Sequence, residues 1–147
     1  MEITLQDVSN SGDVPGEDEF RQWLLAALER QDVKVTVRLV DEEEMGELNH
    51  RYRHKSGPTN VLSFPFEDPP GISSGILGDI VICAPVVRRE AKEQEKTVLS
   101  HWAHMVIHSI MHLQGYDHKD EQEALAMETQ ETRIMMQLGF PAPYNEN

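Results

Sequence analysis

Three observations predict the fold class of this chain. Its 147 residues suit one domain and are enough to bury a substantial core. Segments with alternating apolar residues, typical of strands, are interspersed with segments whose apolar residues recur at three or four positions, typical of helices. No repeat or linker-like stretch divides the chain. We therefore expect an α/β (α+β) fold: a single domain over residues 1–147, with a four-stranded mixed sheet and about five helices packed on it.

Strand and helix alternate over the first half of the chain. Near-alternation of apolar residues over 3–8 predicts a first strand. Helical apolar spacing over 20–28, after the acidic run 17–19, predicts a first helix. Alternation over 33–39 predicts a half-buried second strand, and Asp41 predicts the N-cap of a second helix. The end of this second helix is basic: Arg51, Arg53, His54 and Lys55.

Two strands open the second half. The apolar runs 61–64 and 76–82 predict the third and fourth strands, on either side of a surface loop rich in proline and glycine. We expect 76–82 to be buried on both faces. Asp79 would then be a buried carboxylate that needs a partner, with a hydrogen bond near the functional site.

Three helices complete the predicted fold. Pro85 suits the first turn of one helix. A second helix runs from Thr97 to about Gln114, and we expect it to be central because its flanks are apolar on nearly every side. A third begins at Asp117 or Asp120 and keeps helical apolar spacing.

Composition narrows the possible partners and location. The net charge of -13, from 13 basic and 26 acidic residues, disfavours a broad electrostatic grip on nucleic acid or membrane, although a local basic cleft remains compatible with it. The single cysteine, Cys83, excludes an intrachain disulfide and indicates a reducing compartment. The first residues lack the order of a signal peptide, and no apolar run approaches the ~20 residues of a membrane span. We expect a cytoplasmic protein without membrane association.

Three histidines at the end of the predicted central helix indicate a metal site. His108 and His112, four positions apart, lie on one helix face about 6 Å apart along the axis, so both can bind one ion at roughly 2.0–2.1 Å. Gly115 can end the helix, and the chain can then turn to bring His118 as a third ligand. Three nitrogen ligands leave a fourth position for water, as in a catalytic zinc site. This predicts one Zn²⁺ per chain, with a metal-bound water as nucleophile or proton carrier. The alternative is that these histidines are surface residues, or core residues satisfied by hydrogen bonds.

The residue after His108 limits the chemistry. Metalloproteases of the H-E-x-x-H type carry their general base at this position, which here is Ser109. Peptide hydrolysis by that route is therefore disfavoured. Another group could deprotonate the water, the metal alone could lower the pKa of the water toward ~7, or the substrate could assist. A phosphodiester substrate would need a nearby cation, for which Arg51 and Arg53 are candidates.

Several motifs resemble one protein family. The run from His108 to His118 resembles the H-G-x-L-H-L-x-G-Y-D-H signature of the YbeY family of bacterial endoribonucleases that mature ribosomal RNA. Residues 48–53 and 58–65 resemble the second motif of that family, and 77–80 resemble its third. Two positions depart from the signature. Ser109 replaces glycine and Met111 replaces leucine, and the serine bears on helix packing more than on metal binding.

The resemblance implies a function. It implies zinc bound through His108, His112 and His118, with Arg53 important for function, which we interpret as phosphate binding. It implies a single-strand-directed endoribonuclease that acts on the small ribosomal subunit, at the 3′ end of 16S ribosomal RNA, and in ribosome quality control. Two alternatives stay open: a ribosome-associated assembly factor with structural zinc, and a metal-dependent hydrolase of another substrate. A basic groove near Arg53 would favour the nuclease.

Some questions stay open at the level of sequence. They concern the general base, the native metal beyond a preference for zinc, the cleavage site and the oligomeric state. The roles of His104, Asp79 and Asp117 are also open. For His104 we favour a hydrogen-bonding role over metal ligation, because metal-bound histidines need partners.

Overall fold

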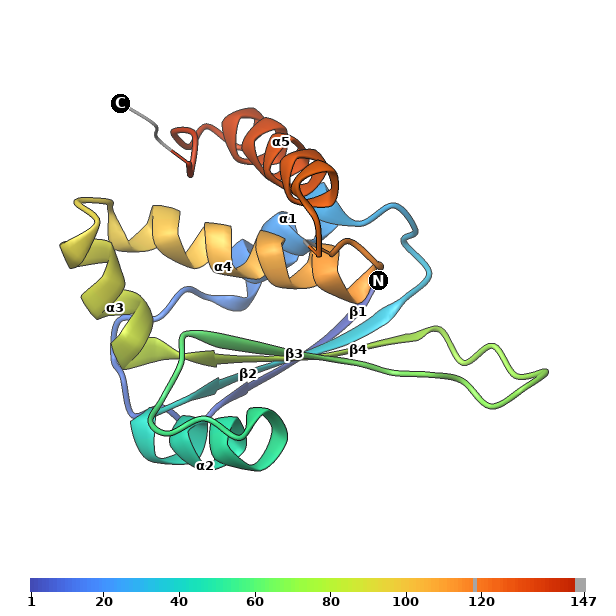
Figure 1. Ribbon diagram of the computed structural model, residues 1–147, viewed down its shortest axis with the longest axis horizontal. Coiled ribbons are helices and arrows are strands. Elements are labelled where there is room, and N and C mark those ends of the chain that lie inside the picture. The colour runs from blue at the N-terminus through green and yellow to red at the C-terminus, as the bar shows by residue number, and fades with distance from the viewer. Residues whose placement is uncertain (118, 145–147) are drawn as a thin grey trace.

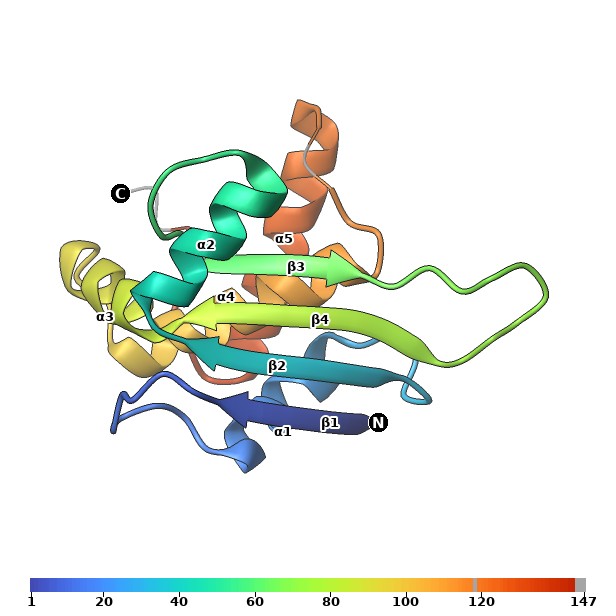
Figure 2. The same cartoon turned by 90° about the horizontal axis from the view of Figure 1, so that it is seen from below.

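A mixed four-stranded sheet forms the middle of the molecule (Figures 1 and 2). The computed structural model describes residues 1–117 and 119–144. The strands are β1 (Glu2–Asp7), β2 (Lys34–Val40), β3 (Val61–Pro65) and β4 (Ile76–Cys83). Their order in the sheet is β1-β2-β4-β3; β1, β2 and β4 are parallel, and β3 pairs antiparallel with β4. The predicted mixed sheet is confirmed, and β3 lies at its edge.

Five helices within the described residues cover this sheet. They are α1 (Glu17–Ala27), α2 (Glu42–Arg53), α3 (Ala84–Glu93), α4 (Val98–Leu113) and α5 (Glu121–Gln137). Figure 1 shows α2 alone below the sheet, α1 and α4 above it, and α5 on the far side of α4. The predicted α+β class and the predicted order of elements are therefore confirmed. None of the helices in the described part of the chain is both long enough and apolar enough to cross a membrane.

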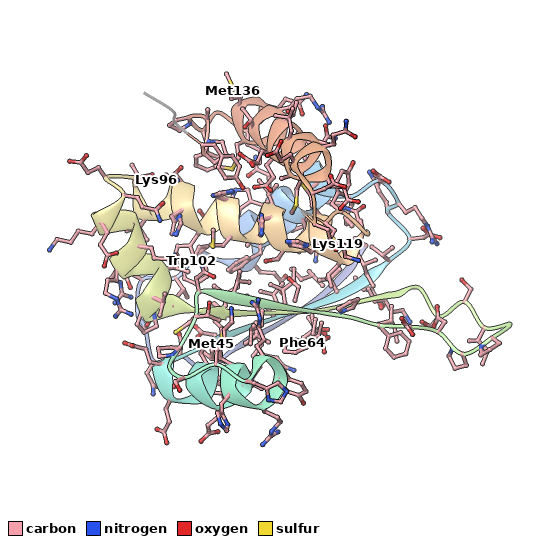
Figure 3. All side chains as sticks on the ribbon, viewed as in Figure 1. Met45, Phe64, Lys96, Trp102, Lys119 and Met136 are labelled. Atoms are coloured by element: carbon pink, nitrogen blue, oxygen red, sulfur yellow. The ribbon has the colours of Figure 1, made fainter. Side chains whose placement is uncertain are left out.

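The sheet separates two hydrophobic cores of unequal size. The larger core lies between the sheet, α1 and α4, where Phe20 and Trp102 meet edge to face with ring centroids 6.0 Å apart. Figure 3 shows Trp102 pointing from α4 toward the sheet. The smaller core lies between the sheet and α2, around the fully buried Met45. Side chains alternate between the two cores along β4, with Ile80 in the larger and Val81 in the smaller.

The expectation that Asp79 is buried is wrong. The second half of β4 is buried on both faces, but Asp79 is exposed. It lies on the same face as Val81 and Cys83, which pack in the smaller core with Met45. The small core does not extend to the position of Asp79, so its carboxylate stays in solvent and needs no buried partner.

Helix α4 is the central helix, as predicted. Twelve of its sixteen residues are buried. Thr97 caps its start, accepting a hydrogen bond from the backbone N–H of Ser100 at 3.1 Å. Gly115 follows its end with φ of +102°, in the left-handed region that favours glycine, and so turns the chain as expected. The next helix is capped by Asp120, which accepts from the N–H of Glu123; of the two predicted caps, Asp120 is the correct one.

Gly78 allows the edge strand to approach α4. Its φ is +151°, and a Cβ at this position would overlap the carbonyl oxygen of Phe64 and lie 3.0 Å from Leu113. We expect Gly78→Ala to lower the free energy of unfolding by about 3 kcal/mol, measured by urea denaturation. Gly12→Ala is the control, since its Cβ would meet nothing within 4 Å; it should change stability by less than about 0.5 kcal/mol. Equal stability of the two variants would contradict the close approach.

Candidate metal centre and cleft

A cleft of about 930 Å³ runs along the edge strand β3. It lies where the end of α2, the strand β3 and the face of α4 that bears histidines come together (Figures 1 and 2). Its lining residues come from five segments of the chain: Tyr52 and Arg53; Asn60 to Pro65; His104, Met105, His108 and His112; Gly115 to Asp117; and Tyr144. The cleft thus brings together the residues that the sequence motifs singled out from distant parts of the chain.

His108 and His112 face each other in this cleft. Their ring centroids are 4.6 Å apart, and their Nε2 atoms are separated by 3.1 Å. Two nitrogens bound to one tetrahedral zinc ion at 2.0–2.1 Å would lie about 3.3 Å apart. The predicted pairing of these two imidazoles on one helix face is therefore present, with a separation that suits a shared metal ion.

Hydrogen bonds to the other ring nitrogens define how each imidazole is protonated. Nδ1 of His112 lies 3.0 Å from the backbone carbonyl oxygen of Tyr116, which can only accept, so Nδ1 carries the proton. Nδ1 of His108 lies 2.9 Å from a carboxylate oxygen of Glu131 and donates in the same way. When both rings are neutral, as metal ligands must be, each Nε2 presents a lone pair to the other, and two lone pairs 3.1 Å apart favour a cation between them. The donor set fits a zinc ion.

His118, the third predicted ligand, lies outside the described residues. The chain reaches Asp117, which lines the cleft, and continues at Lys119, which forms an ion pair with Asp117 at 3.7 Å.

Glu131 of α5 is the buried carboxylate of the site. Its side chain has no solvent exposure. It accepts hydrogen bonds from Nε2 of His104 at 2.6 Å, Nδ1 of His108 at 2.9 Å and the hydroxyl of Tyr144 at 2.8 Å. Burial raises the pKa of Glu131, but the hydrogen bonds from the two imidazoles outweigh it and bring the pKa down to about 2. Glu131 is therefore an ionised acceptor.

His104 is the neutral partner in this network. Burial lowers its pKa, and the hydrogen bond to Glu131 offsets that effect only in part. His104, His108 and Glu131 offer ligand atoms within 4.8 Å of one another, so these three residues could also hold a metal ion. However, 2.6 Å between His104 and Glu131 is the length of a strong hydrogen bond, and it is shorter than the spacing of two ligands on one zinc. We therefore regard the three as a hydrogen-bonded support for the imidazole pair. The hydrogen-bonding role expected for His104 is present.

The guanidinium of Arg53 shares the cleft with the imidazole pair. Arg53 is the last residue of α2 and is exposed to solvent. Within residues 1–117 and 119–144, no carboxylate lies within ion-pair distance of it. Arg51 is also exposed but does not line the cleft. Of the two candidate arginines, Arg53 is the one that lines the same cleft as the histidines.

Aromatic side chains of Tyr52 and Phe64 also line the cleft. Tyr52 is 55% exposed and meets Phe64 of β3 edge to face, with ring centroids 5.1 Å apart. Figure 3 shows Phe64 on the side of the sheet that faces α2. The cleft that Arg53 lines therefore also offers a partly exposed aromatic surface.

Ser109 does not replace the missing protease base. It is fully buried, and its hydroxyl donates to the backbone carbonyl of Met105 at 2.7 Å. The hydroxyl is thus satisfied by a hydrogen bond within its own helix. The H-E-x-x-H mechanism therefore lacks its base in the structure as well as in the sequence.

Two residues of the site were missed by sequence reasoning. Glu131 occupies the apolar stripe of α5, with Met127 four residues before it and Met135 four residues after it. An acid within an apolar helical stripe was the signal available for it. Tyr144, near the end of the described chain, gave no comparable signal.

Comparisons with known proteins agree with the motif resemblance. A family model described as endoribonuclease YbeY matches residues 6–139. The chain is 55% identical to a protein named endoribonuclease YbeY from Methylococcus capsulatus over 146 residues, covering 99% of this chain and 97% of that protein. The fold is shared with the solution structure of TM1509 from Thermotoga maritima, with a TM-score of 0.55 and 24% identity over 98% and 99% of the two chains. The chain therefore belongs to the endoribonuclease YbeY family.

Proposed function

We propose that this protein is a zinc-dependent endoribonuclease that cuts single-stranded RNA. In this proposal residues 1–147 act as one hydrolase domain in the cytoplasm. The substrate is the 16S ribosomal RNA 3′ end on the small ribosomal subunit, with a further role in ribosome quality control. The proposal is carried by one observation: the paired imidazoles of His108 and His112 and the side chain of Arg53 line the same cleft. Family membership supports the reaction class.

In the proposed site each side chain has a separate task. His108, His112 and His118 hold the zinc ion. Zinc, when bound, supplies Lewis acidity and makes a water molecule a better nucleophile at neutral pH. Arg53 binds the scissile phosphate through charge-assisted hydrogen bonds and offsets the negative charge that develops on it. The edge strand β3 forms the floor along which the substrate lies.

The rival functions are less well supported by the cleft. A hydrolase of peptides would need a base where the buried Ser109 stands. A structural zinc ion in an assembly factor would be expected in a closed site. His108 and His112 instead line an open cleft that Arg53 also lines. The net charge of -13 still limits any sequence-independent attraction to RNA, so binding must depend on the cleft itself.

The metal assignment predicts the effect of removing one imidazole. His112→Ala should lose the single equivalent of zinc that the wild type carries, measured by metal analysis of protein prepared without chelator. His50→Ala, an exposed histidine on α2 outside the cleft, should keep its zinc. If His112→Ala keeps zinc while His104→Ala loses it, the metal belongs instead to the cluster of His104, His108 and Glu131. A wild type without stoichiometric metal would contradict the site altogether.

The phosphate assignment predicts a different phenotype for Arg53→Ala. This variant should keep one zinc per chain but cleave a single-stranded RNA about 100-fold more slowly, because it loses a charged donor to the reacting phosphate. Arg51→Ala, two residues away on the same helix but outside the cleft, is the matched control and should cleave normally. Equal activity of the two arginine variants would exclude Arg53 from the site.

The acidic surface and the aromatic wall predict how RNA is bound. If the protein neutralises one or two phosphates of the RNA, raising salt from 50 to 200 mM should weaken binding of an uncleavable oligonucleotide only about 3–7-fold.

Tyr52→Ala should weaken binding of this oligonucleotide about 10-fold through lost base stacking, while Tyr52→Phe should match the wild type. Phe66→Ala, an exposed aromatic outside the cleft, is the control. Fluorescence anisotropy measures these affinities, and an unaffected Tyr52→Ala would rule out stacking on this wall.

A further inference from the structure

The burial of Glu131 calls for a functional explanation. It is a fully buried carboxylate within the apolar stripe of α5, and an ionised group in that position carries a large desolvation penalty. A leucine or methionine at this position would continue the stripe without that penalty. Three hydrogen bonds compensate the charge, and all three come from residues that line the cleft: His104, His108 and Tyr144.

The hydrogen bond to His108 links this buried charge to the candidate metal site. Glu131 accepts from Nδ1, which leaves Nε2 of the same ring directed at Nε2 of His112. A carboxylate in this position fixes the orientation and tautomer of the imidazole and makes its other nitrogen a stronger ligand. Within the described chain, His112 has a neutral partner at Nδ1 instead, the carbonyl oxygen of Tyr116. The partners at Nδ1 of the two histidines therefore differ in charge.

The remaining hydrogen bonds hold Glu131 itself. One carboxylate oxygen, Oε2, accepts from both Nε2 of His104 and the hydroxyl of Tyr144, while Oε1 accepts from His108. Tyr144 also meets the ring of His104 edge to face, with centroids 5.1 Å apart. The carboxylate is thus fixed from three directions, so its position relative to His108 does not depend on side-chain rotation.

We propose that Glu131 is a positioning residue that sets the affinity of the site for a divalent metal ion by holding His108 and adding a negative charge beside it. This inference rests on the proposed function, because it takes His108 and His112 as ligands. In this arrangement Glu131 does not bind the metal directly. Its charge partly balances that of a divalent ion held by neutral imidazoles.

A second histidine of α4, His101, also pairs with a carboxylate and provides a matched control. Glu90 of α3 accepts from Nε2 of the buried His101 at 2.9 Å, and it also accepts from the side-chain amide of Asn60. This pair joins α3 to α4 as Glu131 joins α5 to α4, but His101 does not line the cleft. If Glu131 only joined two helices, replacing Glu131 and replacing Glu90 would have the same effect on the affinity for zinc.

The test is the dissociation constant for Zn²⁺, measured by competition with a chelator on purified, folded protein. Glu131→Gln keeps the shape and removes the charge, so zinc should bind about 10-fold more weakly; Glu131→Ala removes both and should weaken binding about 100-fold. Tyr144→Phe removes one hydrogen bond to Glu131 without touching His108 and should have a smaller effect, about 2–3-fold. Glu90→Gln should bind zinc as the wild type does.

Co²⁺ provides a second readout at the metal itself. The visible absorption bands of the Co²⁺ protein should change in Glu131→Ala and stay unchanged in Glu90→Gln, since only the first removes the hydrogen bond that holds the proposed ligand His108. If Glu131→Ala fails to fold, Glu131→Gln and Tyr144→Phe still decide the matter.

Three results would overturn the inference, and each is distinct from failure of the proposed function. Zinc affinities of both Glu131 variants within about twofold of the wild type would show that the carboxylate only joins helices. An equal loss in Glu90→Gln would show a general effect of destabilising α4. A loss beyond about 1,000-fold in Glu131→Gln would make Glu131 a direct ligand. If the wild type itself binds no zinc, the proposed function fails instead.

Discussion

The burial of helix α4 is the constraint on which the rest of the site depends. Twelve of its sixteen residues are buried, yet the helix carries four histidines in a row along one side. A buried imidazole needs hydrogen-bond partners, because an unsatisfied polar group in the interior is costly. The neighbouring segments supply one protein partner to each imidazole, while Nδ1 of His101 and Nδ1 of His104 are buried without a partner among the described residues. The partners are Glu90 from α3, Glu131 from α5 and the backbone carbonyl of Tyr116 after the helix.

The position of these partners divides the row of histidines into two kinds. His101 and His104 direct Nε2 at a carboxylate of a neighbouring helix, so their hydrogen bonds join α4 to α3 and α5, and the bond from His104 also holds Glu131. His108 and His112 use Nδ1 for their partners and direct Nε2 at each other on one face of α4, which lines the cleft. A histidine of α4 is thus a structural contact when its neighbour bonds to Nε2, and a candidate metal ligand when its neighbour bonds to Nδ1.

Local patterns predicted those features that depend on neighbouring residues in the chain. Alternation and helical spacing located the strands and helices, and the spacing of His108 and His112 predicted their pairing. The patterns failed where the answer depends on distant parts of the chain. Asp79 is exposed because the small core beneath the sheet stops short of it. Glu131 escaped notice because its partners lie 23 and 27 residues earlier. Arg53 lines the same cleft as the histidines because β3 lies at the sheet edge, which spacing alone did not reveal.

The acidic character of the protein becomes consistent with an RNA substrate when the charges are considered locally. A net charge of -13 repels a polyanion from most of the surface, whereas the cleft presents Arg53 and, in the proposed state, a divalent ion. Binding is then favourable only where a phosphate reaches these two cations. A duplex held by its backbone charge gains little on such a surface, whereas a flexible strand can follow the edge of β3 and place a base against Tyr52. In the proposed function, the same charge distribution that weakens nonspecific binding would favour single strands at the cleft where cleavage is proposed to occur.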